Sequence, residues 1–398
     1  MLNIIGGSYF EQCIQPFWDE LYGSGLRSVL SLHGRTPLRF YTYSDSVTLT
    51  LLNDIALLLQ FELKTYTISK NVEFVYEHPL SNPSYFPKKI DFIHTEKIHV
   101  VTKENIICFG MIEGNASVSG DKVVYDPQDP SNPKSFYENG SNANKLIIIL
   151  NWNEAILLSG TSDIREIQDY FLNKEKAFAA ILKSGADGAY VIQGGSIELI
   201  PAFITEKVWP IGSGDIFTSH FGYNWMIENK TVLEAAWEAS MATAYFASSK
   251  ALPIPPTLPA HLTPFYKKPG RNKKVYLAGP FFTMGQRWMI NQFRDALSNV
   301  GFDVFSPFHD VGIGKPEKVA PLDLKGIDDC DIVVALVDGL DSGTLFEIGY
   351  AKAKSKFVMV FMENEKEESL TMLKGTNCLF EDDFSSIIYK TIWQAYSE

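Results

Sequence analysis

Residues 331–362 read "DIVVALVDGLDSGTLFEIGYAKAKSKFVMVFM" and hold two apolar runs separated by an amphipathic stretch. The runs "DIVVALV" and "KFVMVFM" predict buried strands, and "TLFEIGYAKAKS" predicts a helix between them. A strand, a crossover helix and a second strand favour a parallel pair, and continuous apolar runs are typical of strands that are covered on both faces. This stretch therefore predicts an α/β sheet.

The sequence before this stretch extends the same pattern. "KVYLAGP" at 274–280 and "FDVFSP" at 302–307 predict two further short strands, and "QRWMINQFRDALSNVG" predicts a helix that ends at Gly301. We expect a small doubly wound domain, with a flavodoxin- or Rossmann-like parallel sheet, over residues 273–398.

A proline-rich segment separates this domain from the rest of the chain. "ALPIPPTLPAHLTPFYKKPGRNKK" at 251–274 holds six prolines and ends in a basic run, and proline disfavours regular structure. We therefore predict a first domain at 1–262, a linker at 263–272 and a second domain at 273–398. The first domain is also predicted to be α/β from strands such as "KLIIILN" and two strong helices after residue 211. Residues 35–110 are strand-rich, but their order is not predictable.

Composition limits the classes of function. The 398 residues carry a net charge of -12, so we expect small-molecule partners and no nucleic acid. No apolar stretch reaches ~18 residues, and the start of the chain lacks the features of a signal peptide, so we expect no membrane contact and a cytoplasmic location. The four scattered cysteines and seven unclustered histidines predict no metal site and no disulfide framework.

Acidic residues crowd the turn after the strand "DIVVALV", where Asp338, Asp341 and Glu347 follow one another. One interpretation is structural, because Thr344 and Glu347 have the spacing of a capping box at a helix start. The other is a reaction centre, because open α/β sheets bind ligands at the carboxyl ends of their strands. Gly343 and Gly349 would leave room beside Glu347 for a flat substrate.

"VYLAGPFF" and "DLKGIDDCDIVVALVDGLDSGTLFEIGYA" together resemble the nucleoside 2-deoxyribosyltransferase family over residues 273 to about 380. The resemblance implies that Glu347 attacks the anomeric carbon, that Asp323 and Asp341 hold sugar hydroxyls and handle the proton on the base, and that Tyr276 orients Glu347. No cofactor is implied. The other substrate-binding positions expected are Gly279, Phe282, Arg287, Asp338, Ser342, Gly343 and Asn377.

Two parts of this domain, the start of the helix after "GPFFTMGQ" and the aromatic tail, have more than one interpretation. Arg287 and Trp288 could face a phosphate, although a solvated Arg287 and a core Trp288 are the plainer interpretation. The aromatic tail, with Trp393 and Tyr396, could close a neighbouring subunit's site, because family members often complete the site with a second subunit. We expect a homo-oligomer on that ground.

"WPIGSGDIFTSHF" at 209–221 forms a second constellation. Gly212, Ser213 and Gly214 could place free amides around an anion at a helix start, with Asp215 in the first turn. A flexible loop capped by Asp215 is the plainer alternative.

The order of "VVYDPQDP", "LIIILNWNEAILLSG", "AAILKSGADGAYVI" and this turn resembles ribokinase-like (PfkB) sugar and nucleoside kinases over roughly 120–260. The resemblance implies that Asp215 is the base for a hydroxyl group and that the glycine turn binds phosphate. It also implies ATP and Mg as cofactors of this domain, with Asn151 and Glu154, or a motif that starts at Asn153, near the Mg-phosphate.

The first third departs from that family, since only Gly23, Gly25 and Arg27 suggest its substrate motif. Three hypotheses follow: an enzyme that breaks N-glycosidic bonds through Glu347, a bifunctional salvage kinase and transferase, and a ligand-gated effector. In the effector, the kinase-like domain senses a nucleotide and the second domain depletes a nucleotide pool such as NAD.

Overall fold

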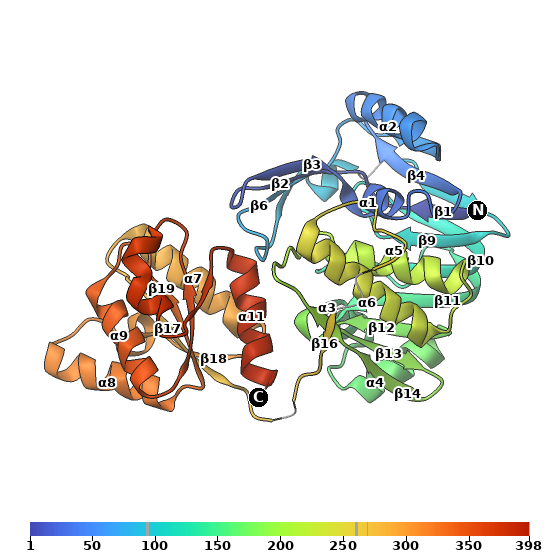
Figure 1. The fold of residues 1–398 in the computed structure, drawn as a ribbon. Helices are drawn as coiled ribbons and strands as arrows, with labels where there is room; N and C mark the ends of the chain where they lie inside the picture. The colour runs from blue at the N-terminus through green and yellow to red at the C-terminus, as the bar shows by residue number, and fades with distance from the viewer. Residues whose placement is uncertain (93–94, 259–261, 269, 398) are drawn as a thin grey trace. The chain divides into compact units, whose positions relative to one another are not determined.

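The computed structural model describes residues 1–92, 95–258, 262–268 and 270–397. The chain forms two compact units (Figure 1). Unit 1 contains Met1–Thr205 and Trp209–Phe265, and unit 2 contains Glu206–Val208 and Tyr266–Glu398. Residues 259–261 and 269, which lie in or beside the predicted linker, are outside the described residues.

A ten-stranded sheet forms the centre of unit 1, in the order β14-β13-β12-β11-β10-β9-β1-β4-β5, with β8 paired to β10. All pairings are parallel except those of β13 with β12 and β14. The strands are β1 (Leu2–Ile5), β4 (Leu38–Ser44), β5 (Glu62–Thr67), β8 (Ile98–Val101), β9 (Asn105–Phe109), β10 (Ala116–Asp126), β11 (Asn142–Asn151), β12 (Ala179–Lys183), β13 (Ala189–Gln193) and β14 (Ser196–Ile200).

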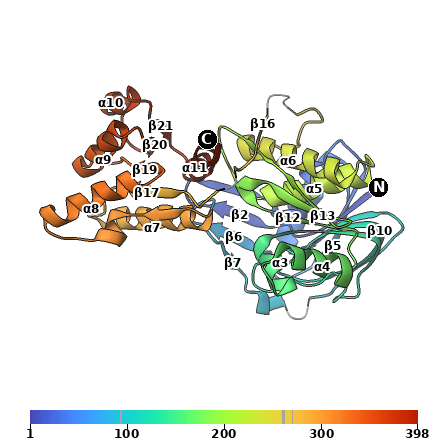
Figure 2. The ribbon, with the colours of Figure 1, turned by 90° about the horizontal axis from the view of Figure 1, so that it is seen from below.

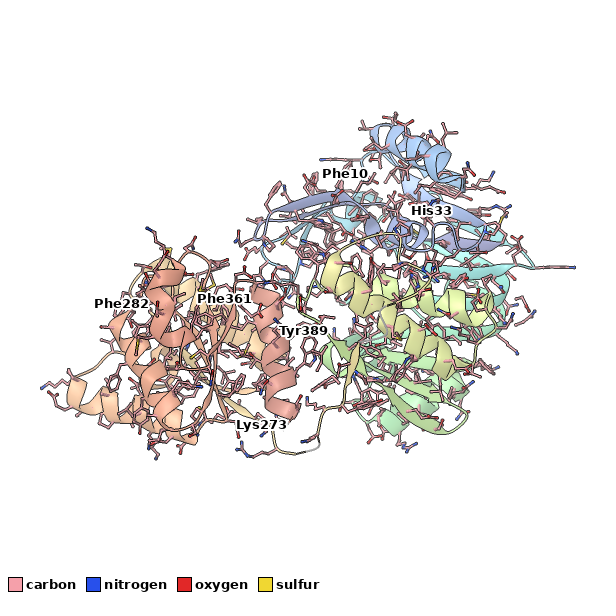
Figure 3. All side chains as sticks on the ribbon, viewed as in Figure 1. Phe10, His33, Lys273, Phe282, Phe361 and Tyr389 are labelled. Atoms are coloured by element: carbon pink, nitrogen blue, oxygen red, sulfur yellow. The ribbon has the colours of Figure 1, made fainter. Side chains whose placement is uncertain are left out.

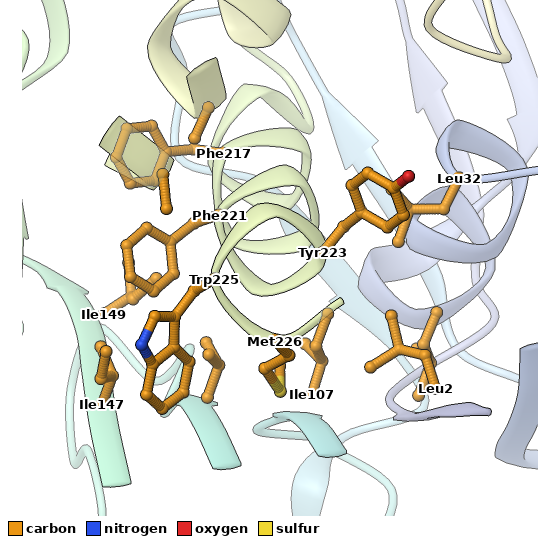
Figure 4. Packing of buried hydrophobic residues seen from close by; sticks show 14 of the residues in the cluster. Leu2, Leu32, Ile107, Ile147, Ile149, Phe217, Phe221, Tyr223, Trp225 and Met226 are labelled. Carbon is orange, nitrogen blue, oxygen red and sulfur yellow. The ribbon is translucent and has the colours of Figure 1, made fainter. Parts of the chain in front are cut away.

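Helices cover both faces of this sheet (Figure 2). One face carries α1 (Gly23–Ser31), α2 (Ser46–Leu59), α5 (Ser213–Met226) and α6 (Val232–Ser249); the other carries α3 (Trp152–Ser159), α4 (Ile164–Asp169) and a π-helical turn at Tyr170–Lys174. Figure 4 shows Phe221 and Trp225 of α5 beside Ile149 and Ile147 of β11, and Phe217 belongs to the same buried cluster. This contact anchors α5, whose first turn carries the glycine motif.

Two smaller sheets complete unit 1. β2 (Phe10–Cys13), β3 (Trp18–Leu21), β6 (Glu73–Tyr76) and β7 (Ser84–Phe86) form a four-stranded sheet in the order β3-β2-β6-β7. β15 (Ala202–Ile204) pairs antiparallel with β16 (Thr263–Phe265). The first three residues of the predicted linker therefore form a strand in unit 1.

Unit 2 contains the expected parallel sheet, with five strands in the order β18-β17-β19-β20-β21. The strands are β17 (Lys274–Ala278), β18 (Asp303–Phe305), β19 (Ile332–Leu336), β20 (Phe357–Phe361) and β21 (Leu379–Glu381). The helices are α7 (Met284–Asn299), α8 (Pro316–Asp329), α9 (Ser342–Ala353), α10 (Thr371–Lys374) and α11 (Phe384–Ser397). The α/β fold class predicted from the sequence is confirmed.

The two faces of this sheet have different helices. Ile327 of α8 and Ile348 of α9 pack with Tyr276 and Val333 on one face. On the other face, Phe293 of α7 contacts Phe361 and Phe384. The candidate carboxylates lie on α8 and α9, so they belong to the first of these faces.

The C-terminal helix is part of the core of its own unit. Trp393 and Tyr396 are only 5% and 4% exposed. The Tyr396 hydroxyl accepts a hydrogen bond from the Lys273 backbone N–H at 3.2 Å, and its ring lies against Phe302. The Tyr396 side chain is therefore not free to close the site of another subunit, as the sequence had suggested, whereas that role of Trp393 stays a prediction.

Candidate active site

The start of α9 places the acidic turn. Asp341 is the N-cap, and its Oδ2 accepts hydrogen bonds from the Thr344 N–H at 2.8 Å and the Thr344 hydroxyl at 3.0 Å. A Cβ on Gly343 would lie 3.0 Å from this oxygen, so glycine leaves room for the cap. The capping explanation of Glu347 is wrong, because Asp341 caps the helix and Glu347 lies in its second turn.

Glu347 is paired with a tyrosine of the sheet. The buried Tyr276 hydroxyl, on β17, donates a hydrogen bond to Glu347 Oε1 at 2.7 Å. Burial raises the pKa of Glu347 to about 7, the Tyr276 bond opposes this rise, and the charges of Asp323 and Asp341 add to it. A carboxyl group with a pKa near neutrality is poised to change protonation during a reaction.

Asp323 contributes the third carboxyl group from α8. Burial raises its pKa to about 6. Its Oδ1 is inaccessible to solvent and has no hydrogen-bond partner among the described residues. A buried oxygen without a partner costs free energy unless a ligand or a proton satisfies it, so the structure leaves Asp323 with an unused bonding position.

The three carboxyl groups and Tyr276 therefore come together, although Tyr276 and Glu347 are 71 positions apart in the sequence. Among the groups that set the pKa of Glu347, none is a cation. Such a site favours a substrate that develops positive charge, and its raised pKa values allow a proton to be held near neutral pH.

The loop after β17 lies at the carboxyl edge of the sheet. A Cβ on Gly279 would lie 2.8 Å from the Ile290 side chain, so glycine lets α7 approach the strand. Phe282, labelled in Figure 3, is 68% exposed and stacks on Phe281. Arg287 Nε donates to the Phe281 carbonyl at 2.8 Å.

Trp288 follows Arg287 on α7 and is 41% exposed. The core interpretation of Trp288 is therefore wrong. The guanidinium group of Arg287 lies 5.7 Å from the centre of the Phe308 ring, which places the charge beside an aromatic ring of the segment that follows β18.

Asp338 has a structural role in the turn. Its carboxylate accepts the backbone N–H groups of Glu363 and Asn364 at 3.0 and 2.9 Å, which fastens the loop after β19 to the loop after β20. It borders a pocket of about 200 Å³ on the α7 side, lined by Pro280, Gly285, Gln286, Met289, Leu336, Asp338, Phe361, Glu363 and Asn364. Ser342 is the exposed first residue of α9.

Asn377 does not join the other predicted residues. It precedes β21, so it lies at the amino edge of the parallel sheet, whereas Gly279 and Asp338 lie at the carboxyl edge. Its carbonyl accepts a hydrogen bond from Lys352 at the last turn of α9. The family resemblance had suggested Asn377 as a substrate-binding position, and the strand direction does not support that prediction.

The glycine turn of unit 1 begins α5. Gly212 is the N-cap with a φ of +78°, a conformation that favours glycine. The Ser213 and Asp215 N–H groups bond to the Pro210 and Gly212 carbonyls at 3.0 and 3.1 Å. A Cβ on Gly214 would lie 3.4 Å from Lys183 Nζ, so an ammonium group lies beside this turn.

Asp215 is engaged on both oxygens. Oδ2 accepts a hydrogen bond from Arg27 Nη1 at 2.5 Å, and Oδ1 accepts one from Gln128 Nε2 at 2.6 Å. Arg27 also pairs with Glu11 of β2, and a Cβ on Gly212 would lie only 2.2 Å from Arg27 Nε. The motif suggested by Gly23, Gly25 and Arg27 therefore places a buried guanidinium group against the glycine turn.

The Asn151–Glu154 element forms a capping box at the start of α3. Each side chain accepts the backbone N–H of the other residue at 2.9 Å. Burial raises the pKa of Glu154 to about 7, and the nearby Asp126 adds to this rise. Asn153 instead donates to the Pro130 carbonyl.

The structure also shows charged residues that the sequence motifs missed. Lys183 Nζ donates to Asp126 Oδ2 at 2.6 Å beneath the glycine turn. The Tyr9 hydroxyl donates to Glu113 at 2.7 Å, and burial raises the pKa of Glu113 to about 7. Asp126 and Lys183 are the last residues of β10 and β12, and Tyr9 and Glu113 follow β1 and β9, so a prediction of the strand order would have revealed them. Within the described residues, no cluster of histidine, cysteine and acidic side chains could hold a metal ion.

Comparisons with protein families agree with both resemblances. Residues 67–259 match the model of the pfkB family carbohydrate kinases, and residues 275–382 match that of nucleoside 2-deoxyribosyltransferase. The chain is thus a fusion of a PfkB kinase-like part and a nucleoside deoxyribosyltransferase-like part, and both parts match families of enzymes. The predicted family resemblances are confirmed.

Individual proteins match only part of this chain or have low sequence identity to it. An uncharacterized protein of Ureaplasma parvum, UU063, is 36% identical over 99 residues, which cover 21% of this chain and 63% of that relative's length. Among solved structures, fructokinase of Vibrio cholerae (13% identity, TM-score 0.46) and ribokinase of Thermotoga maritima (14%, 0.46) each match 63% of this chain and at least 93% of their own. None of the described helices is long and apolar enough to cross a membrane.

Proposed function

We propose that unit 2 cleaves or transfers the N-glycosidic bond of nucleosides or nucleotides, with Glu347 as the nucleophile. The observation that supports this most is the Tyr276–Glu347 pair at 2.7 Å, with Asp323 and Asp341 close enough to affect the same carboxyl group. The match of residues 275–382 to nucleoside 2-deoxyribosyltransferase points to the same chemistry.

In the first step, an ionised Glu347 oxygen forms a bond to the anomeric carbon while the carbon–nitrogen bond to the base breaks. The electron pair leaves with the base, which takes a proton from an acid, and we assign this role to Asp323 because burial raises its pKa to about 6. In the second step, another base or water attacks the anomeric carbon and releases Glu347. No metal is required.

Asp341 would hold a sugar hydroxyl in this scheme. Its Oδ2 is occupied by Thr344, while Oδ1 accepts no hydrogen bond from the described residues. One oxygen would thus fix the start of α9, and the other would bind substrate. Tyr276 would keep Glu347 oriented and favour its ionised form.

The test is chromatography of the full chain incubated with nucleosides, deoxynucleotides and NAD, each with and without a second free base. Free or exchanged base is expected, and Glu347→Gln should reduce it by at least about 10³-fold. Asp328→Asn serves as the control for Asp323→Asn, because Asp328 lies on the same helix but is exposed and pairs with Lys354. Unchanged base release in Glu347→Gln would refute the proposal.

One observation favours a second candidate, the ligand-gated effector. Arg27 and Gln128 occupy both oxygens of Asp215, so binding of a nucleotide without phosphoryl transfer is a better reading of unit 1 than a bifunctional salvage kinase. Lys183, beside the glycine turn, would contact a phosphate group of the ligand; ATP and Mg as cofactors remain part of this proposal.

ATP consumption by the full chain, measured with sugars and nucleosides as acceptors, separates the two readings. The effector hypothesis predicts that the chain consumes no ATP. It also predicts that base release by unit 2 rises when a nucleotide is added. ATP consumption that disappears in Asp215→Asn would support the salvage kinase, and full base release without any nucleotide would count against gating.

A further inference from the structure

The side chain of Tyr276 is held from behind by an aromatic ring. Tyr276 on β17 is the register partner of Phe305 on β18, so both side chains point to the same face of the parallel sheet. Their ring centres lie 5.5 Å apart with planes inclined by 22°. This near-parallel stack limits rotation of the Tyr276 ring, whose hydroxyl reaches Glu347.

A glycine on α8 makes room for that ring. A Cβ on Gly326 would lie 2.5, 2.8 and 2.9 Å from three carbon atoms of Phe305. Such distances are too short for any real contact, so an alanine would push Phe305 toward Tyr276 or push α8 away from the sheet. Gly326 thus allows α8, which also carries Asp323, to lie directly on Phe305.

We propose that Phe305 and Gly326 are positioning residues that hold the Tyr276 ring where its hydroxyl donates to Glu347. The inference rests on the proposed function for its effect on catalysis, but the contact itself is independent of it. A fixed donor keeps the bond short and favours the charged carboxylate, whereas a mobile ring would lose that bond for part of the time.

Other titratable groups face the same carboxyl group and act in the opposite direction. Asp323 from α8 and Asp341 from α9 raise the pKa of Glu347, as burial does. Cys330 and Asp323 also act on Tyr276, and the Lys274 ammonium group lies 5.6 Å from the Phe305 ring centre. The Tyr276 bond is therefore the local interaction with another side chain that lowers the proton affinity of Glu347.

The experiment is to titrate the Glu347 carboxyl carbon by NMR in the full chain labelled with ¹³C-glutamate, assigned by comparison with Glu347→Gln. Phe305→Leu should increase the proton affinity of Glu347 by up to about tenfold, which is one pKa unit. Phe302→Leu is the matched control: Phe302 lies three residues before the half-buried Phe305, is itself buried, and packs on Tyr396 rather than on Tyr276. The control should not move the titration.

Gly326→Ala gives a second, independent test, because alanine is normally more favourable than glycine in a helix interior. Here it should shift the Glu347 titration in the same direction as Phe305→Leu. In a Tyr276→Phe background neither substitution should shift it further, because the bond is already absent. Equal titrations in Phe305→Leu and the unaltered chain would overturn the inference, even if the base-release assay succeeds.

The activity assay then separates this inference from the proposed function. If both hold, Phe305→Leu lowers kcat several-fold with little change in KM, and Phe305→Tyr, which preserves the stacked ring, restores it. If Glu347→Gln leaves base release intact, the proposed function fails, while the NMR titration still decides the role of Phe305.

Discussion

Replacement of Arg27 by methionine should strongly destabilise unit 1. The Arg27 side chain is 2% exposed, and the two carboxylates that it joins, Glu11 and Asp215, are 6% and 11% exposed. Because solvent screens these charges poorly, removal of the shared cation leaves two buried anions without compensation. We expect a loss of about 3–5 kcal/mol in the free energy of unfolding.

The loss should depend on pH in a defined direction. Burial raises the pKa of Glu11, and Arg27 opposes that rise; without Arg27 the pKa in the folded state will be higher still. A carboxyl group with a raised folded-state pKa destabilises the protein at pH values above it, and protonation relieves the cost as the pH falls. The deficit of Arg27→Met should therefore be larger at pH 8 than at pH 5.

Urea unfolding followed by tryptophan fluorescence measures the deficit, and hydrogen exchange at α1 and α5 locates it. Arg39→Met is the control, because Arg39 is 25% exposed and pairs with the exposed Glu62 and Glu104; its loss should stay below about 1 kcal/mol. Equal losses in the two variants, or a deficit that grows as the pH falls, would refute the reasoning.

Three further predictions concern the two sites. If base release needs one proton shared between Glu347 and Asp323, its pH profile should be a bell with limbs near about 6 and about 7, and a profile flat from pH 5 to 9 would contradict this. Tyr276→Phe removes the hydrogen bond to Glu347 and should lower kcat by about 10–100-fold with little change in KM, measured by steady-state base release; a change confined to KM would instead indicate a role in binding. Gly212→Ala combines a φ of +78° with a 2.2 Å approach to Arg27, so thermal unfolding should show a loss of at least about 1–3 kcal/mol, and an unchanged Tm would show that the turn relaxes freely.

The fold of unit 2 was predictable because each of its central strands is a short, continuous apolar run between helices. The same rule failed for α2 in unit 1, whose sequence "SVTLTLLNDIALLL" is rich in apolar and β-branched residues and lies in the region expected to be strand-rich. The helix begins where the Asp45 side chain accepts the Thr48 N–H at 2.8 Å. A capping contact of this kind decides between helix and strand when the apolar pattern suits both.

The candidate site of unit 2 was predictable where the direction of a parallel strand decides at which edge of the sheet a residue lies. Tyr276, Asp323 and Glu347 lie together as expected, whereas Asn377 lies at the other edge because β21 begins after it. The pairing of Arg27 with Asp215 spans 188 positions. No local pattern indicates such a contact, because it depends on where α1 and α5 meet in three dimensions.

The surroundings of the carboxyl groups give a physical reason to place the chemistry in unit 2. Asp215 has charged or polar donors on both oxygens, so its negative charge is already used within the fold. Glu113 has a raised pKa and a tyrosine partner, as Glu347 does, but it is only 1% exposed and a substrate cannot reach it without rearrangement.

Glu347 differs from both of these buried acids, Asp215 and Glu113, in its exposure. It is partly exposed, and its pKa is raised to about 7. Its only hydrogen-bond donor among the described side chains is a neutral hydroxyl, from Tyr276. Burial without a neutralising cation costs stability, and such a cost persists where the group is needed for a reaction. Because Arg27 neutralises the charge of Asp215, the same argument favours a structural or ligand-binding role for these two residues. Loss of a measured phosphoryl transfer in Asp215→Asn would contradict that role.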